Sequence, residues 1–144
     1  MTEPSFRRFL TRSLATLEAE LPSGYAAMAQ ALGRRDVDVE VDGERLAICG
    51  NAHHLAIADA AIKPTAHARA SSAALRAILD GTYSLESAVL AEVIELRGAL
   101  DDLVAFYDAL KAYFNAAVRC PSFAGLLAEY LAAGPQPRDT EHAK

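Results

Sequence analysis

Residues 79–103 read LDGTYSLESAVLAEVIELRGALDDL, and this stretch decides the fold of the chain. It combines the end of one helix, a second short helix, a strand and the start of a third helix. It contains no plausible nucleophile, no cluster of metal ligands and no phosphate-binding loop. The segment therefore predicts an architecture rather than a catalytic chemistry.

Serine and glycine residues set the boundaries of the elements in and before this stretch. Gly81, in a position that tolerates a left-handed backbone, closes a helix that Ser71 or Ser72 caps. Ser84 caps the second, short helix. Residues 93–97 then have the pattern of a strand, with Ile94 and Leu96 on one side, and Gly98 ends this strand.

The strongest helical periodicity of the chain begins directly after this strand. Pro121 ends that helix at about Val118, and Ser122 is expected to cap a last helix. The residues on the apolar face of the first of these helices are Leu100, Leu103, Val104, Tyr107, Leu110 and Phe114. Those of the last helix are Phe123, Leu126, Leu127 and Tyr130.

Two helices and a β-hairpin are predicted upstream. One apolar stripe covers residues 4–20, and an alanine-rich helix follows to about Leu32, where Gly33 stops it. Valines then alternate with acidic residues over 36–42, which is the pattern of a half-buried strand. Asp42-Gly43 is a two-residue turn of the kind that joins hairpin strands.

Three further segments complete the predicted sheet. Residues 46–50 pair with the first strand, and residues 53–58 form a third strand. Because Pro64 fits only the edge or the start of a strand, residues 65–70 are predicted to be a short edge element. Together with the helices, these strands indicate an α+β fold in which helices cover one face of a sheet.

Length and composition favour one folded domain. The chain has 144 residues, of which 52% are hydrophobic and 23% are charged. The net charge of -5 argues against a nucleic-acid binder, because phosphate contacts need a basic field. Cys49 and Cys120 form neither a disulfide framework nor a CxxC motif. No signal peptide or membrane span is visible, so a soluble, cytoplasmic protein is expected.

The order of these elements resembles the sterol carrier protein 2 (SCP-2) family of lipid-binding domains, over about residues 36–130. It implies an SCP-2-like α+β fold with about five mostly antiparallel strands, in a domain of residues 36–133. Residues 1–35 would then form an N-terminal helical extension, and residues 134–144 a flexible tail. The residues that carry the resemblance are Val39-x-Val41-Asp42-Gly43, ASSAALRAILDG at 70–81, Ser87-Ala88, Glu95-Leu96-Arg97-Gly98 and Leu103.

The resemblance also implies a non-catalytic domain that holds a hydrophobic ligand in an apolar tunnel, without a cofactor or a metal. The ligand would be a fatty acyl, sterol-like or isoprenoid molecule, and transient contact with a membrane fits such a role. The side chains compatible with a tunnel wall are Leu79, Leu85, Val89, Leu103, Phe106, Tyr107, Leu110, Phe114, Phe123, Leu127 and Tyr130. Any filled core would contain the same residues, so an elongated void behind residues 100–114 would separate the two interpretations.

Two other functions stay open. The first is an accessory or oligomerisation module that binds a partner protein or a second copy, as a homodimer. It is favoured by the apolar stripe of the leading helix, which needs a surface to cover it: Phe6, Phe9, Leu10, Leu14 and Leu17. The second is a small isomerase-like or cyclase-like enzyme with an apolar cavity and one carboxylate, for which Asp59 and Glu92 are the candidate acids.

Other chemistries lack their motifs. The chain has no GxSxG elbow of an esterase and neither the GxGxxG nor the GxxxxGK[ST] loop of nucleotide-binding proteins. His53 and His54 are adjacent on a predicted strand and therefore point to opposite faces. A metal site that joins them to His67 and Asp59 is not expected, since nothing in the spacing requires one.

Overall fold

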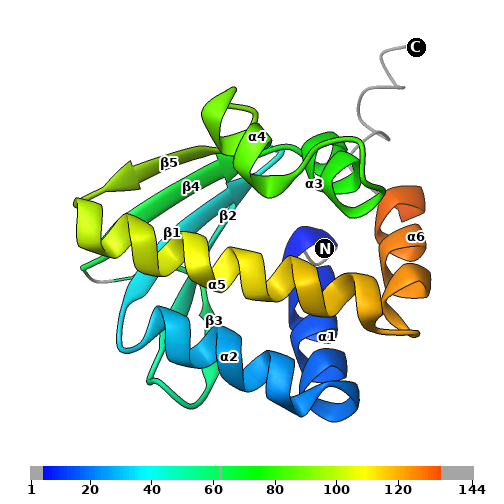
Figure 1. The fold of residues 1–144 in the computed structure, drawn as a ribbon, viewed down its shortest axis with the longest axis horizontal. Coiled ribbons are helices and arrows are strands. Elements are labelled where there is room, and N and C mark those ends of the chain that lie inside the picture. The colour runs from blue at the N-terminus through cyan, green and yellow to red at the C-terminus, as the bar shows by residue number, and fades with distance from the viewer. Residues whose placement is uncertain (1–4, 62, 134–144) are drawn as a thin grey trace.

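The computed structural model describes residues 5–61 and 63–133 of the chain (Figure 1). Pro4 and the expected tail, residues 134–144, lie outside the described residues. None of the helices in the described ranges is long and apolar enough to cross a membrane. The elements are α1 (Ser5–Glu20), α2 (Pro22–Leu32), β1 (Asp36–Val41), β2 (Glu44–Gly50), β3 (Leu55–Ala58), β4 (Ala66–Ala70), α3 (Ser72–Leu79), α4 (Leu85–Leu90), β5 (Glu95–Gly98), α5 (Leu100–Arg119) and α6 (Phe123–Ala133).

The five strands form one open sheet in the order β3-β2-β1-β4-β5. β1 pairs in parallel with β4, and the other three pairs are antiparallel. The predicted α+β fold with a mostly antiparallel sheet is confirmed. The predicted edge position of residues 65–70 is wrong, because β4 lies between β1 and β5. Pro64 precedes the strand, so its missing N–H costs no hydrogen bond in the ladder.

The predicted turn and two of the predicted helix caps are present. Asp42 and Gly43 have φ values of 53° and 84°, as the hairpin turn with the right-handed twist requires. The hydroxyls of Ser71 and Ser84 each accept a hydrogen bond from a backbone N–H three residues later. Ser122 differs from the prediction, since its hydroxyl donates to the carboxylate of Glu20, at 2.5 Å, instead of capping α6.

The register of the strands separates an apolar face of the sheet from a charged one. Val39 of β1 lies opposite Leu46 of β2 and Ala68 of β4, and these side chains face the helices. The neighbouring pair in the register, Glu40 and Arg45, points to the other face. In Figure 1, α5 runs across the sheet with α2 beside it.

The apolar stripe of α1 is covered by the same chain. Its stripe residues are at most 6% exposed. The ring of Phe9 stacks on Tyr130 of α6 at a centroid distance of 4.8 Å and meets Phe123 edge-on at 5.7 Å. The carboxylate of Glu44 in β2 accepts hydrogen bonds from two backbone N–H groups in the first turn of α1, those of Phe6 and Arg7, at 2.9 and 2.8 Å. Side-chain packing and a long-range cap thus fix α1 onto the domain.

Small residues bring α2 and α5 close together. A Cβ atom at Gly24 would lie 3.0 Å from that of Ala116, and Ala29 and Ala116 are fully buried. A pair of helices can approach this closely only where the facing side chains are small. The many alanines of the chain therefore have a structural role here. At the other end of the pair, Arg35 donates to Asp102 of α5 at 2.9 Å.

Candidate ligand-binding cavity

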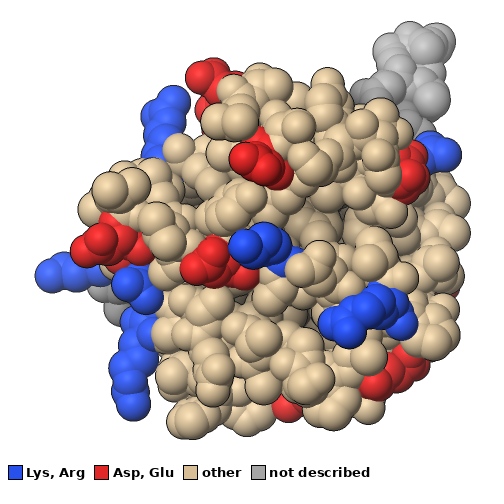
Figure 2. Space-filling view, in the orientation of Figure 1, with Lys and Arg blue, Asp and Glu red and all other residues tan. Residues whose placement is uncertain are grey.

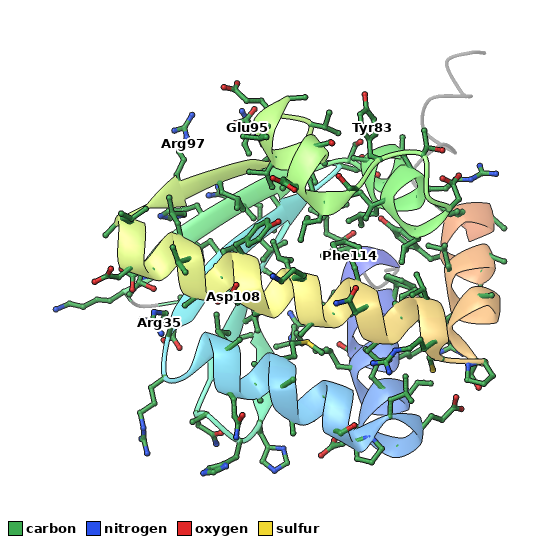
Figure 3. All side chains as sticks on the ribbon, in the orientation of Figure 1. Arg35, Tyr83, Glu95, Arg97, Asp108 and Phe114 are labelled. Carbon is green, nitrogen blue, oxygen red and sulfur yellow. The ribbon has the colours of Figure 1, made fainter. Side chains whose placement is uncertain are left out.

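An apolar cavity of about 90 Å³ lies between the helix-covered face of the sheet and α5. Val39 of β1 and the alanines Ala68 and Ala70 of β4 form its floor, and Leu79 of α3 forms part of its side wall. The α5 residues that border it are Phe106, Ala109, Leu110, Tyr113 and Phe114, at the i, i+3, i+4, i+7 and i+8 positions of one helix face. Figure 3 labels Phe114 on this helix.

Space remains above the floor of the cavity because β4 offers only the small side chains of alanine to the helices. Ala68 and Ala70 border the cavity, and Ala68 lies beside Val39 in the register. Val39 is half-buried, although its neighbours on the same face, Val37 and Val41, are 0% and 2% exposed. The helices therefore close over the ends of this valine row and leave a space above its centre.

The two leading helices build another wall of the cavity. Phe6, Phe9, Leu10 and Leu14 of α1 border it, as do Met28 and Leu32 of α2. These residues were not among the predicted wall residues, because the family resemblance begins after them. The sequence does show the α1 residues as an apolar stripe that needs to be covered. In the structure, this stripe packs against α6 and faces the cavity.

The structure separates the eleven proposed wall residues into three groups. Leu79, Phe106, Leu110 and Phe114 border the cavity. Val89, Leu103 and Tyr107 border an outer groove between α4 and α5. The others pack elsewhere: Phe123, Leu127 and Tyr130 in the core with α1, and Leu85 in a smaller cluster with Ile78 and Ala88. Contact of any of these residues with a ligand stays a prediction.

The polar groups beside the cavity have partners. Ser13 is fully buried, and its single hydroxyl proton goes to the carbonyl of Leu10 at 3.0 Å. Its oxygen can therefore only accept from the hydroxyl of Tyr113, at 2.9 Å. Burial raises the pKa of Tyr113, so this hydroxyl stays neutral. Glu40 contributes to the wall between two inward valines, and its side chain points to the opposite face of the sheet.

The volume limits what the cavity holds in this conformation. A cavity needs only about 10–15 Å³ to hold a water molecule, and an engineered cavity of about 150 Å³ binds benzene. Pockets that take up a whole small-molecule ligand measure roughly 300–1,000 Å³. The cavity of about 90 Å³ therefore fits a narrow apolar group, and a longer molecule must extend beyond it or push the helices apart.

The other residues considered for chemistry lie away from the cavity. Asp59 forms an ion pair with Arg7 at the surface, and Glu92 is exposed in the turn between α4 and β5. His54 lies 3.6 Å from a carboxylate oxygen of Glu18. Within residues 5–61 and 63–133, no three His, Cys, Asp or Glu side chains gather as ligands for a metal ion.

Comparison of the sequence with family models finds no match, and comparison with curated proteins finds none. Solved structures do match. Sterol carrier protein 2 is 13% identical, with a TM-score of 0.51 over 78% of this chain and 95% of that one. A conserved hypothetical protein from Thermus thermophilus, described as possibly a sterol carrier protein, is 14% identical, with a TM-score of 0.50 over 77% and 89%. A UbiJ-SCP2 ubiquinone synthesis protein gives 14% and 0.48 over 73% and 96%.

At these identities the likeness concerns the fold, and the first two structures carry it. Helices cover one face of a five-stranded sheet in the element order that the sequence predicted. The chain has the SCP-2-like α+β fold.

Proposed function

We propose that this protein is a non-catalytic lipid-binding domain whose cavity holds the hydrocarbon part of its ligand against α5. The observation that carries the proposal is the apolar cavity between α5 and the sheet, since well-packed cores contain few voids larger than a water molecule. The fold supports it, since one similar structure is named a sterol carrier protein. Each methylene buried contributes about 0.8 kcal/mol, so a long chain could gain on the order of 10 kcal/mol before ordering costs.

The chemistry of the wall supports binding without catalysis. A general acid or base must reach the reacting atoms within hydrogen-bond distance or through one water. Asp59 and Glu92 do not border the cavity. Tyr113 does, but its raised pKa and its bond to Ser13 make it a poor base near neutral pH. A ligand in this space would meet hydrocarbon on nearly every side.

The alternative, an accessory or oligomerisation module, was favoured by the uncovered stripe of the leading helix. That stripe packs against α6, faces the cavity and is buried within the chain, so it does not require a partner. A partner protein that binds elsewhere, or a homodimer, would appear in the experiments below as clean protein without a ligand and with a larger mass in solution.

The first test identifies what the protein carries. The protein is purified from its own host, because a foreign host would supply its own lipids, and is examined by native mass spectrometry and lipid extraction. We expect a stoichiometric hydrophobic ligand. Protein that is free of lipid and that also fails to bind fluorescent fatty acids would contradict the proposal.

The second test places the ligand in the cavity. Leu110→Trp fills the space beneath α5, and we expect it to weaken the binding of a fluorescent fatty acid by at least about tenfold, the equivalent of roughly two buried methylenes. The matched control is Val118→Trp, which changes a residue that is 63% exposed on the same helix and does not border the cavity. Equal affinities for the two variants, with both folded by circular dichroism, would place the ligand elsewhere.

A further inference from the structure

A groove on the surface runs beside the cavity, between α4, β5 and the first half of α5. Its apolar lining consists of Val89, Ile94, Leu96, Leu103, Val104 and Tyr107. β5 is an edge strand, so none of the described strands covers this side of the sheet. The groove is therefore bounded by two helices and an edge strand.

Ile94 separates the groove from the cavity. It borders both spaces and is 4% exposed. It lies in the short turn between α4 and β5, in which Glu92 has a φ of 61°, a conformation that is uncommon for a residue other than glycine. Ile94 is the residue that the linings of the cavity and of the groove have in common.

Exposed apolar side chains gather at this groove. In the described part of the chain, five large apolar residues are exposed. One of them lines the groove, and two others lie close along the chain to residues that line it. Val104 lines the groove and is 51% exposed. Leu100 lies one turn before it on α5 and is 75% exposed, and Leu90, next to the lining residue Val89, is 76% exposed. Single exposed apolar residues are ordinary, whereas a group of them marks a contact site for apolar surface.

The charges at the rim of the groove balance. Arg69 and Arg97 stand opposite Glu92 and Glu95, and Arg69 donates to both oxygens of Glu95 at 3.0 and 3.2 Å. Figure 3 shows Arg97 projecting away from α5, and Figure 2 shows that charged side chains are scattered over the largely uncharged face around α5. The two arginines and two glutamates of the rim therefore compensate one another, and they frame the apolar side chains of the groove.

A second groove also adjoins the cavity, between α1 and β3. It shares Leu14 and Leu55 with the cavity wall. Its rim carries Arg7, Arg8, Arg12 and Glu18 on α1. Both grooves have charged rims, but the charges of this one do not balance, and no exposed leucine or valine is among its lining residues. This makes it the less favourable route for an apolar chain.

We propose that the groove between α4 and α5 is the entrance through which a linear hydrocarbon chain reaches the cavity, with Ile94 moving aside to admit it. This inference rests on the proposed function and adds its route and the shape of its ligand. A linear chain is specified because the space beyond Ile94 is about 90 Å³, less than the roughly 150 Å³ of a cavity that accepts a benzene ring.

The test compares the two routes by obstructing each with the same residue. The chain contains no tryptophan, so Val104→Trp, Thr11→Trp and Val118→Trp each introduce one, at exposed helical positions. Val104 lines the proposed entrance, Thr11 lines the groove between α1 and β3, and Val118 lines neither. Stopped-flow mixing with cis-parinaric acid, a linear polyunsaturated fatty acid whose own fluorescence rises in an apolar environment, reports the association rate of the unchanged protein and of every variant.

We expect Val104→Trp to slow association by about tenfold, within the range over which interface changes alter association rates, while Thr11→Trp and Val118→Trp stay within about twofold of the unchanged protein. Slowing by Thr11→Trp alone, or equal rates for all three variants, would overturn the inference and leave the proposed function standing. An unchanged protein that binds no fatty acid at all would instead overturn the proposed function. If Val104→Trp does not fold, Val104→Glu obstructs the same entrance with a charge, and the same slowing is expected.

Discussion

Gly98 occupies a position where β5 approaches the chain before β4 too closely for a side chain. A Cβ atom there would lie 2.7 Å from the carbonyl oxygen of Thr65 and 3.1 Å from the Cα of Ala66, and φ is 148°. Both neighbours are backbone atoms, so they cannot swing away as a flexible side chain could. This close approach explains why the strand ends in glycine.

Gly98→Ala is therefore expected to lower the free energy of unfolding by roughly 1–3 kcal/mol, the cost of one strained backbone position. The control is Gly125→Ala in α6, where an added Cβ meets no atom within 4 Å. That change should raise stability by roughly 0.5–1 kcal/mol, since alanine favours a helix more than glycine does. Urea denaturation measures both, and a similar effect of the two substitutions would contradict this account of Gly98.

At the same scale, the sequence predicts which side of a helix is apolar better than it predicts what that side packs against. The period of α5 places Phe106, Leu110 and Phe114 on one side, and all three border the cavity. Phe123 and Tyr130 have equally good spacing, yet their rings pack against Phe9. Which apolar face meets a void and which meets another side chain depends on tertiary packing, which periodicity does not contain.

Among the elements, β4 shows where local patterns fail. Its alternating alanine and polar residues carry no signal of burial, and the preceding proline suggested an edge. The parallel pairing joins β1 to β4, and β2 and β3 lie between these two strands along the chain. Such a pairing is decided by contacts distant in sequence, whereas the hairpin turn and the caps at Ser71 and Ser84 are local and were predictable.

One carboxylate connects three helices and makes this connection dependent on pH. Glu20, at the end of α1, accepts hydrogen bonds from Ser122 at 2.5 Å and from the thiol of Cys120 at 3.2 Å, in the turn between α5 and α6. These bonds, with that from Ser122 the larger cause, hold the pKa of Glu20 below its ordinary value of 4.5. A depressed pKa in the folded state stabilises the fold above the pKa of the unfolded chain, and the contribution is lost as pH falls through the folded value.

We therefore expect the stability difference between the unchanged protein and Glu20→Gln to be largest above pH 4.5 and to shrink in more acidic solution. Ser122→Ala, which removes the main donor but keeps the carboxylate, should weaken the same pH dependence. Denaturation curves from pH 7 down to the acid limit, for all three proteins, measure it. A difference that stays constant with pH would show that the hydrogen bonds to Glu20 do not depend on its charge.

For the whole molecule, the proposed binding in the cavity and the groove predicts a dependence of affinity on the length of the hydrocarbon chain. The cavity is small, but it adjoins the apolar groove through a single isoleucine. A linear ligand would first fill the space beneath α5 and then extend along the groove into solvent. Each methylene that becomes buried contributes about 0.8 kcal/mol, whereas a methylene in solvent contributes nothing.

The dissociation constants of a series of saturated fatty acids should therefore fall by up to about fourfold per added methylene and then reach a plateau once the apolar path is full. Val104→Glu, at the groove, should bring the plateau to shorter chains, because a charge then ends the path earlier. Titration calorimetry or competition against a fluorescent fatty acid measures the series. Affinities independent of chain length would mean that the cavity and the groove do not bind the chain, since apolar burial in a continuous path must increase with each carbon until the path ends.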